Sequence, residues 1–415
     1  MSLDVNISEP EEFSCVELHS CLEDVAKVLD FNDFKYHVDL ISGKGESYVA
    51  NIFRVVIKEN EDNGKNVNVI VKTLINTTRR ELFRDLHNRE VLVYEEVIPK
   101  FMQIQRKLDL KQRFCFPECL YTNANKNKEI IVLQDLKDIG FGIDERISKF
   151  EELNYKQTKL ILTQLAKLHA LSFVYEKVEK ENFDKVKEKF ADILFQEKFL
   201  TKSKLRNYFF ESYDMSLKFV TNIEAKKKLN ELRNKLVHIL RFYTQPSKHN
   251  VLCHGDVWLN NILFKEEGEE DEICFLDYQV MRYCSPVIDI IYFMYLSTTS
   301  KFRSENFEDL QQVYYDSLKS FLNLYDLNVN NIYPWTEFID ELKYSLPFGL
   351  IMALVEMRII TTSPEDEAIL RRNNIEFSVV PGEVELFKYR VNDLVEESIS
   401  NGVLVKLLET IAAFY

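Results

Sequence analysis

Residues 251–264 read VLCHGDVWLNNILF, and this stretch decides the fold. Within it, Asp256 stands two residues after His254, and Asn261 follows five residues after Asp256. The spacing His-x-Asp-x-x-x-x-Asn is that of the catalytic loop of kinases. In such a loop the carboxylate orients the attacking hydroxyl and accepts its proton, while the amide oxygen ligates Mg²⁺. The stretch therefore predicts phosphoryl transfer, with Asp256 as the catalytic residue and Asn261 as a metal ligand.

A second acidic position follows after a short predicted strand pair, residues 262–264 and 273–276. Residues 275–279 read FLDYQ, and Asp277 lies sixteen residues after Asn261. A carboxylate that ends a short apolar strand fits the second Mg²⁺ ligand of a kinase. The Asp256–Asn261 motif alone, or the Asp277 motif alone, is also explained by a capped turn. The two motifs in this order predict a kinase-like site with Asp277 as the second metal ligand.

Lys72 lies near the end of an apolar predicted strand, residues 67–74. A lysine at this point reaches the phosphates of a nucleotide as a point charge. Glu90, on the long helix that we predict over residues 78–107, is the expected ion-pair partner. Glu81 and Glu95 remain rival partners on the same helix. A solvated strand-end lysine and an exposed helical carboxylate are the plain alternatives.

Two further segments are candidates for nucleotide contacts. Gly43, Gly45 and Ser47 lie in the first hairpin turn, where glycines let backbone N–H groups approach phosphate oxygens. The third glycine of G-x-G-x-x-G is absent, so a plain hairpin turn explains this segment equally well. Gln134 and Leu136 end a strand at the junction with the helical region, and we predict that backbone groups there bind adenine. The alternative is an ordinary strand followed by a loop.

The pattern along the chain predicts an α+β, two-lobed protein-kinase-like fold. Alternating and β-branched segments indicate strands, and apolar residues at helical spacing indicate helices. A five-stranded antiparallel sheet with helices forms the expected first lobe, residues 1–137, and a mostly helical second lobe spans residues 138–415. The expected elements of the first lobe are a helix at 13–29, strands at 36–41, 48–58 and 67–74, the helix at 78–107, and strands at 117–122 and 129–136.

Four other side chains have more than one interpretation. Asp289 is an acid in an apolar predicted helix, where it either braces the catalytic loop or acts as an ordinary helix N-terminal acid. His254 is expected to brace the loop rather than to transfer protons. His169 is expected to be a packed core histidine. Trp258 either lines the substrate pocket or fills space.

The composition limits the classes of partner. The chain has 415 residues, 46% of them apolar, and a formal net charge of −14. Such an acidic chain disfavours nucleic acid and anionic membranes as partners. The longest apolar stretches, 287–296 and 348–355, are too short to span a bilayer. We therefore expect a small-molecule substrate, no membrane segment and no obligate protein partner.

The cysteines indicate a reducing compartment. Seven are present, an odd number without a disulfide-like spacing, so reduced thiols in a cytoplasmic protein are expected. Cys115 and Cys119 have the spacing of a metal-binding pair. No second pair with ligand spacing accompanies them, which argues against a structural metal site. The first residues also lack the apolar core of a secretion signal.

The stretches 254–264, 276–282 and 285–289 resemble the insect ecdysteroid kinase-like family, also called choline-kinase-like. This family is related to aminoglycoside phosphotransferases and choline kinases. The resemblance covers roughly residues 35–415. Further similar segments are residues 131–136, 165–172, 387–390 and 402–404.

The resemblance implies ATP as phosphoryl donor, Mg²⁺ as cofactor and a steroid-like or other small hydroxylated acceptor. It implies Asp256 as the catalytic base, Asn261 and Asp277 as Mg²⁺ ligands, and Lys72 paired with Glu90. The acceptor pocket is expected within residues 183–243 and 297–360. Two departures are Gln134, where an acid is usual, and Tyr278, where a phenylalanine is usual.

Two other functions remain as alternatives. A catalytically silent binding protein could keep the fold for ligand sequestration, but the intact set of Lys72, Asp256, Asn261 and Asp277 argues against it. A protein kinase is disfavoured because the catalytic loop lacks the usual Arg, the Asp277 segment lacks the usual Gly, and no Ala-Pro-Glu segment follows.

Overall fold

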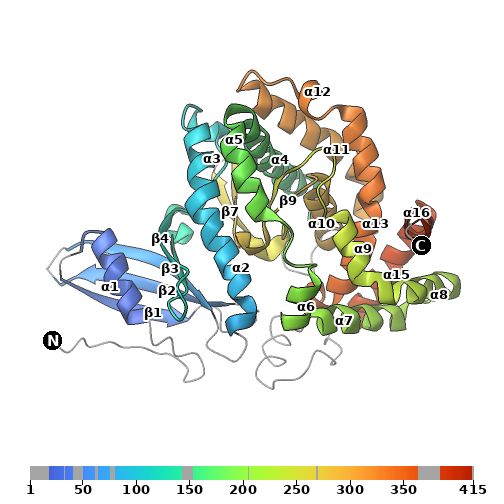
Figure 1. Ribbon diagram of the computed structural model, residues 1–415, viewed down its shortest axis with the longest axis horizontal. Coiled ribbons are helices and arrows are strands. Elements are labelled where there is room, and N and C mark those ends of the chain that lie inside the picture. The colour runs from blue at the N-terminus through green and yellow to red at the C-terminus, as the bar shows by residue number, and fades with distance from the viewer. Residues whose placement is uncertain are drawn as a thin grey trace.

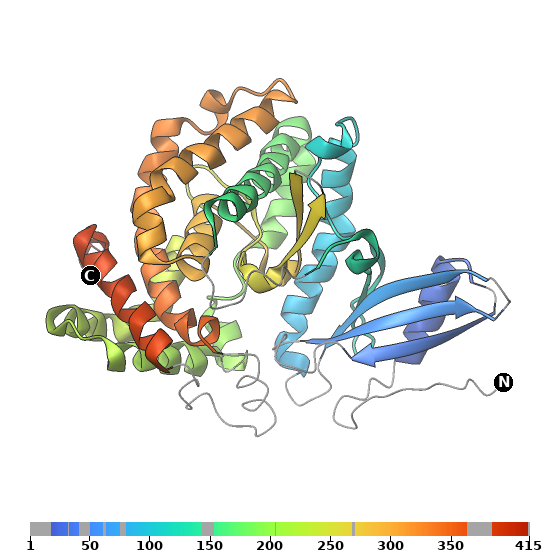
Figure 2. The same ribbon diagram turned by 180° about the vertical axis from the view of Figure 1, so that it is seen from behind.

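The computed structural model describes residues 18–31, 33–40, 50–60, 64–74, 80–142, 153–203, 205–267, 270–362 and 384–413. A sheet lies at one end of the molecule and a helical body at the other, with two consecutive helices between them (Figure 1). The view from behind shows the same division (Figure 2). Gly43, Gly45 and Ser47 lie outside the described residues.

The sheet has five antiparallel strands in the order β1-β2-β3-β5-β4. In β2, Phe53, Val55 and Ile57 are buried and alternate with more exposed residues, because successive side chains point to opposite faces. Helix α1 (Leu18–Val28) covers the buried face, and Leu22 and Val25 join the same core. The predicted sheet is confirmed, with strands β1 (Phe34–Leu40), β2 (Ala50–Glu59), β3 (Asn66–Leu74), β4 (Cys119–Asn123) and β5 (Ile130–Gln134).

The helix that we predict over residues 78–107 is interrupted by one wider turn. It consists of α2 (Arg80–Leu92), a π-helical turn η3 (Val93–Val97) and α3 (Ile98–Gln105). Pro99 follows this turn, and its ring lacks an N–H and crowds the carbonyl four residues back. Val97 and Phe101 are fully buried in the core of the helical part. The helix therefore connects the sheet to the helical part.

The remainder is mostly helical, as predicted, with two short two-stranded sheets. Strand β6 (Val251–Cys253) pairs with β9 (Arg282–Cys284), and β7 (Ile262–Glu267) pairs with β8 (Glu270–Phe275). The helices are α4 (Tyr155–Val178), α5 (Lys180–Lys187), α6 (Glu197–Ser203), α7 (Leu205–Phe219), α8 (Ile223–Leu232), α9 (Leu236–Tyr243), α10 (Val287–Ser297), α11 (Ser300–Asn323), α12 (Val329–Ile332), α13 (Trp335–Ile360), α15 (Val384–Ser400) and α16 (Val403–Ala412). Every residue of α10 is buried, so this helix forms the centre of the second core. The α+β class is thus confirmed, with a five-stranded antiparallel sheet followed by a mostly helical part.

Helices α10 and α13 pack unusually close together at Gly349. A Cβ atom at that position would lie 2.6 Å from the Ile291 side chain and 2.8 Å from the Tyr295 ring. Only a glycine allows this approach, and it lets α13 lie directly against the helix that begins beside the catalytic loop.

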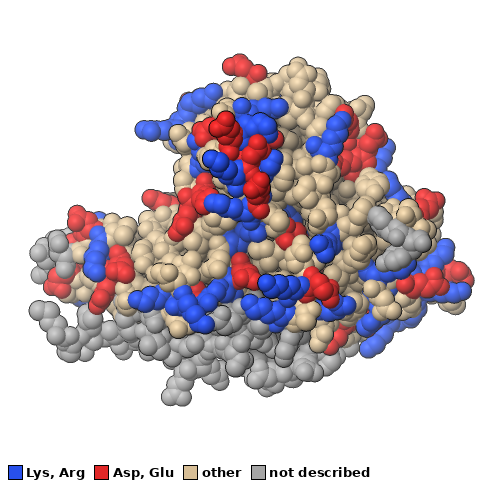
Figure 3. All heavy atoms as spheres, viewed as in Figure 1, with Lys and Arg blue, Asp and Glu red and all other residues tan. Residues whose placement is uncertain are grey.

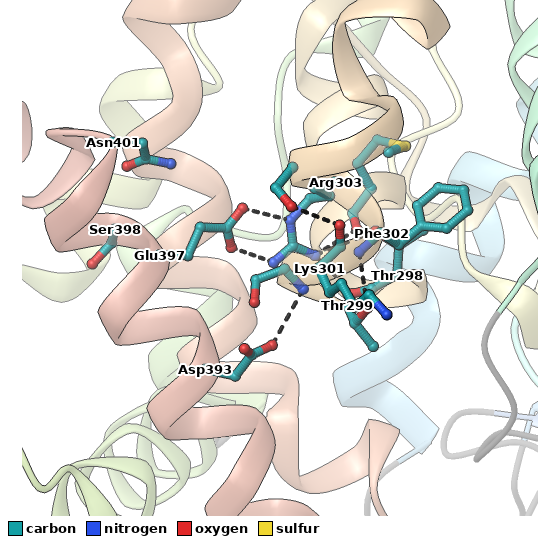
Figure 4. Close-up of polar contacts among 12 residues, drawn as sticks. Thr298, Thr299, Lys301, Phe302, Arg303, Asp393, Glu397, Ser398 and Asn401 are labelled. Atoms are coloured by element: carbon teal, nitrogen blue, oxygen red, sulfur yellow. Dashed lines mark hydrogen bonds and ion pairs between the residues drawn. The ribbon is translucent and has the colours of Figure 1, made fainter.

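A buried ion pair fastens the C-terminal helix α15 to the junction of α10 and α11. The guanidinium group of Arg303 pairs with the carboxylate of Glu397, and its Nη1 donates to the Thr298 carbonyl at 2.7 Å (Figure 4). The backbone N–H of Ser300 donates to Asp393 at 3.2 Å. The Arg303 side chain is only 4% exposed, so its charge depends on these partners.

We expect Glu397→Ala to lower the free energy of unfolding by about 3 kcal/mol, because it leaves the Arg303 charge buried without its carboxylate. Urea denaturation measures this loss. The control is Glu385→Ala on the same helix, whose partner is Lys388 and whose side chain is 89% exposed. That change should cost less than about 1 kcal/mol. Equal losses in the two variants would contradict a special contribution of the buried pair.

Charged side chains of both signs lie on the surface of the helical part. On the face shown in Figure 3, acidic and basic side chains lie side by side over much of the helical part. Every cysteine within the described part of the chain is a free thiol. No helix in that part has both the length and the apolar character needed to cross a bilayer.

Candidate active site

The predicted catalytic loop, residues 254–261, runs from the end of β6 into a short 3-10 turn, η8 (Leu259–Asn261). The amide nitrogen of Asn261 donates to Asp256 Oδ2 at 2.9 Å and to the Asp256 carbonyl at 3.0 Å. The hydroxyl of Tyr292, on α10, donates to Asp256 Oδ1 at 2.7 Å. Both carboxylate oxygens of Asp256 are therefore held in place by neighbouring donors.

The environment of Asp256 makes its carboxylate unusually basic. Burial raises the pKa of Asp256 to about 6, and the nearby Asp277 charge acts in the same direction. The hydrogen bonds from Tyr292 and Asn261 oppose this rise in the pKa. At neutral pH the group is still ionised, and it accepts a proton more readily than an ordinary aspartate does.

Lys72 joins the sheet to the loop that carries Asp277. Its Nζ lies 2.6 Å from Glu90 Oε2 and 2.7 Å from Asp277 Oδ1. Burial alone lowers the pKa of Lys72, but the charges of Asp277 and Glu90 outweigh it and the net pKa is raised. The lysine is therefore a fixed positive charge. Of the rival partners, Glu95 accepts a hydrogen bond from Thr122 at 2.6 Å, and the side chain of Glu81 lies outside the described residues.

Asp277 adopts a backbone conformation that is uncommon for residues other than glycine. Its φ and ψ are 67° and 68°, in the left-handed region, at the start of the 3-10 turn η9 (Tyr278–Val280). Oδ1 pairs with Lys72, and Oδ2 accepts a hydrogen bond from Gln279 at 3.1 Å. Strained conformations of this kind persist where the surroundings fix a side chain in a particular direction, and they are common at functional sites.

His254 links the loop of Asp256 to the loop of Asp277. Its Nδ1 accepts from the backbone N–H of Asp256 at 3.2 Å, so Nε2 carries the proton and donates to the Leu276 carbonyl at 3.0 Å. Burial lowers the pKa of His254, which keeps the ring neutral. The ring uses both nitrogens in bracing, which confirms the prediction that His254 braces the loop.

Asp289 holds the same loop from the opposite side. Its carboxylate accepts from the backbone N–H of His254 at 2.7 Å and of Gly255 at 2.9 Å. The bracing interpretation is confirmed, and Asp289 is also an acid in the first turn of α10. His169 is fully buried, as predicted, and contacts Asp289 through Nε2 at 3.2 Å and the Tyr314 hydroxyl through Nδ1 at 2.7 Å.

Gly255 is the one position of the loop that no other residue could take. Its φ is +88°, and a Cβ there would lie 2.3 Å from the Val280 carbonyl oxygen. The catalytic loop and the segment after Asp277 are therefore in direct backbone contact. The N–H of Leu276 also donates to the Asn261 carbonyl at 2.8 Å, so the two predicted metal ligands sit on hydrogen-bonded backbones.

The oxygens at this junction fit Mg²⁺. Because the amide nitrogen of Asn261 is directed at Asp256, its Oδ1 is left as the ligand atom. Asp277 adds carboxylate oxygens, and hard oxygen donors are what Mg²⁺ prefers. A second group, His169, Cys253 and Asp289, has ligand atoms within 4.8 Å of one another and is wholly buried. Asp289 already accepts hydrogen bonds from the catalytic loop and contacts His169. We therefore interpret this second group as a structural hydrogen-bond network.

The predicted adenine-binding segment lies at the end of β5. The N–H of Gln134 donates to the Glu118 carbonyl at 2.9 Å, and the Leu136 carbonyl accepts from Phe141 at 3.0 Å. Leu136 is buried with Phe141, and the partly buried Leu276 packs against them. The segment therefore offers apolar surface next to the Asp277 loop. Its role in binding adenine stays a prediction.

Two residues near Asp256 were not identified from the sequence. Tyr292 lies one turn after Asp289 on α10, and this i, i+3 spacing is a signal that would have found it. Glu356 is an acid in the apolar part of α13, and it accepts from the Tyr208 hydroxyl at 3.0 Å. Burial raises the pKa of Glu356 to about 8, and the charge of Asp256 adds to the shift. Trp258, for which the sequence allows two roles, is only partly buried.

The raised pKa of Glu356 predicts a pH-dependent stability. The folded chain keeps this group protonated between the unfolded pKa of 4.5 and the folded pKa of about 8, whereas the unfolded chain releases the proton. The free energy of unfolding should therefore fall as pH rises through this window, by up to about 1.4 kcal/mol per pH unit.

Urea denaturation at several pH values between 5 and 8.5 measures this slope. Glu356→Gln removes the titration, so it should flatten the slope and leave the variant more stable than the natural chain at the upper end. An identical pH dependence in the two proteins would contradict the assignment to Glu356.

Comparison with known proteins identifies the family. The chain matches the ecdysteroid kinase-like family over residues 44–327. No curated protein matches it. One similar solved structure is an ethanolamine kinase from Plasmodium vivax, with 15% identity over 82% of this chain and 81% of that chain and a TM-score of 0.37. A second is a microcompartment-associated aminopropanol kinase, with 11% identity over 92% of this chain and 98% of that chain and a TM-score of 0.42. A third is a type VIII aminoglycoside-3′-phosphotransferase, with 13% identity over 80% of this chain and 98% of that chain and a TM-score of 0.36. The family match covers more than half of the chain and confirms the resemblance seen in its motifs: the chain belongs to the ecdysteroid kinase-like family.

Proposed function

We propose that the chain is an ATP-dependent kinase that phosphorylates a hydroxyl group of a small molecule. The observation that carries this proposal is the convergence of groups that lie far apart in sequence. Lys72 pairs with both Glu90 and Asp277, while Asn261 pairs with Asp256. A positive charge, two metal-ligating groups and a basic carboxylate are the parts that phosphoryl transfer requires.

In this proposal each part acts on a different atom of the reaction. Lys72 binds the phosphate oxygens of ATP, and Glu90 keeps its ammonium group in place. Asn261 Oδ1 and the Asp277 carboxylate hold Mg²⁺, which when bound neutralises charge on the phosphate oxygens. Asp256 accepts a hydrogen bond from the acceptor hydroxyl and takes its proton as the oxygen bonds to phosphorus, while the ADP oxygen leaves on the opposite side.

The acceptor is proposed to enter from the side of α7 and α13. Glu356 and Tyr208 come from these helices. The Asp256 charge raises the pKa of Glu356, and Glu356 raises the pKa of Tyr292, as expected for groups that lie near one another. A neutral carboxyl and a phenol can bind additional hydroxyl groups of an acceptor. An ecdysteroid or a related steroid or foreign compound, as the family suggests, has several such hydroxyls.

The test is a phosphorylation assay with purified protein, ATP and Mg²⁺. Ecdysteroids are tested individually, and a fractionated metabolite extract is tested without choosing an acceptor in advance. Mass spectrometry should find products that have gained one phosphoryl group and that are absent when EDTA removes the metal. Absence of product in every fraction, together with no calorimetric binding of Mg²⁺–ATP, would overturn the proposal and favour a binding protein.

A further inference from the structure

Arg89 is the neighbour of Glu90 on α2, but its side chain reaches into the helical part. Its Nη1 donates to the Met281 carbonyl at 2.5 Å, and its Nη2 donates to the Ala191 carbonyl at 3.0 Å. The guanidinium group also lies 4.9 Å from the centre of the Phe190 ring. Arg89 is 7% exposed, so these contacts are shielded from water.

Arg282 follows Met281 in the chain and binds the segment of Ala191 and Asp192 as well. Its Nη1 pairs with Asp192 at 3.2 Å, next to Ala191, and its Nη2 donates to the Gly255 carbonyl at 2.9 Å. The side chains of Arg282 and Asp192 are 3% and 1% exposed. The two arginines therefore connect α2, the turn before α6, the strand β9 and the catalytic loop into one hydrogen-bonded cluster.

The cluster is electrostatically unusual. One buried carboxylate, Asp192, pairs with Arg282 and also acts on Arg89 through its charge. Burial lowers the pKa of Arg89 to about 10, with Arg282 adding to the shift and Asp192 opposing it. Burial also raises the pKa of Asp192. Such a cluster is stable only while the carbonyl oxygens of Met281, Ala191 and Gly255 stay in place, so it fixes the distances between the segments.

A second arginine on α2 attaches the helix to the sheet instead. Arg84 pairs with Glu129, which directly precedes β5. Arg84 and Arg89 thus fasten the two sides of one helix to different parts of the molecule. Glu90 lies beside the arginine that reaches the helical part, and its own partner Lys72 comes from the sheet.

We propose that Arg89 is a positioning residue: it fixes α2 on the helical part so that Glu90 and Lys72 stay aligned with Asp277 and the catalytic loop. This inference rests on the proposed kinase function. It assigns to Arg89 no contact with substrate. Its effect on the reaction is transmitted through Glu90.

Steady-state kinetics of Arg89→Met tests the proposal. We expect kcat to fall by about 10- to 100-fold, since a displacement of about 1 Å in a catalytic group has effects of that size. KM for ATP should rise, and KM for the acceptor should stay unchanged. Arg89→Lys should recover part of the loss, because an ammonium group keeps the charge but cannot span both carbonyls in the guanidinium geometry.

Arg84→Met is the matched control on the same helix. It removes a partly buried arginine whose partner belongs to the sheet side, and its side chain is 18% exposed. It should lower the thermal midpoint while kcat stays within twofold of the natural chain. Equal kcat losses in Arg84→Met and Arg89→Met would overturn the proposal, because they would reflect general destabilisation.

A double-mutant cycle with Glu90→Gln separates positioning from a structural role. If Arg89 acts through Glu90, the double variant should lose no more kcat than Glu90→Gln alone. Fully additive losses would overturn the inference.

Amide hydrogen exchange keeps the inference testable if the natural chain shows no kinase turnover. Failure of the proposed function would appear as no product from the natural chain. Even then, Arg89→Met should increase exchange in residues 80–92 without increasing it in β2 and β3. Unchanged exchange in α2 would overturn the positioning role independently of catalysis.

Discussion

Asp256→Asn is expected to reduce kcat by about 10²- to 10⁴-fold, the range attributed to general acid–base catalysis. The substitution keeps the size of the side chain and one acceptor oxygen. It removes the negative charge that draws the acceptor proton, and its new amide N–H₂ faces either the Tyr292 hydroxyl or the Asn261 amide, both of which are donors here. Initial rates with saturating ATP measure the change.

The same variant should not lose stability. Since burial raises the pKa of Asp256, the folded chain favours the uncharged form, and a neutral amide removes that penalty above the unfolded pKa of 3.8. A higher thermal midpoint together with lost activity would mark a group retained for function.

A matched control for this variant is Asp214→Asn, whose carboxylate pairs with Arg233 and is 37% exposed. It should leave kcat unchanged. Turnover of Asp256→Asn at the natural rate would rule out Asp256 as the catalytic residue.

Lys72→Met is expected to lower kcat/KM for ATP by about 10²- to 10³-fold, as for the loss of one strong electrostatic contact to a reacting group. It should also destabilise the fold. Glu90 is 1% exposed, and without the ammonium group two carboxylates, Glu90 and Asp277, would face each other in a buried site. Initial rates at varied Mg²⁺–ATP concentration and urea denaturation measure the two effects separately.

A second substitution distinguishes the two effects of Lys72. Lys72→Met combined with Glu90→Gln removes one of the facing charges, so it should recover stability while ATP turnover stays low. Lys58→Met, at an exposed position of the neighbouring strand β2, should change neither quantity. Recovery of activity in the double variant would mean that Lys72 acts only on the fold.

The parts of the site that could be predicted from sequence are those set by local spacing. His254, Asp256 and Asn261 lie within one loop, and Asp277 follows after one hairpin, so their order along the chain largely determines where they meet. Strands were also predictable, because the alternation of buried residues in β2 reflects a single covered face. The division into lobes at residue 137 stays a prediction.

Contacts across long sequence separations could not be predicted. Arg89 donates to the Met281 carbonyl, 192 residues later in the chain. The position of Arg89 on α2 indicates only that its side chain is buried. Glu356 is near Asp256 because Gly349 lets α13 approach α10, which is a matter of packing rather than pattern. The π-helical turn before Pro99 could not be predicted either. A proline in the first turn of a helix is ordinary, and the wider turn becomes necessary only because another helix runs directly into it.

The single neutral imidazole between the two functional loops has a consequence for the speed of the reaction. His254 accepts a hydrogen bond from the backbone of one loop and donates to the backbone of the other. The separation between Asp256 and Asp277, the proposed proton acceptor and the proposed metal ligand, is thereby set during folding, and little reorganisation remains for each turnover of the proposed reaction. Selectivity for the proposed acceptor can then change through α7 and α13 while the spacing of the reacting groups stays the same.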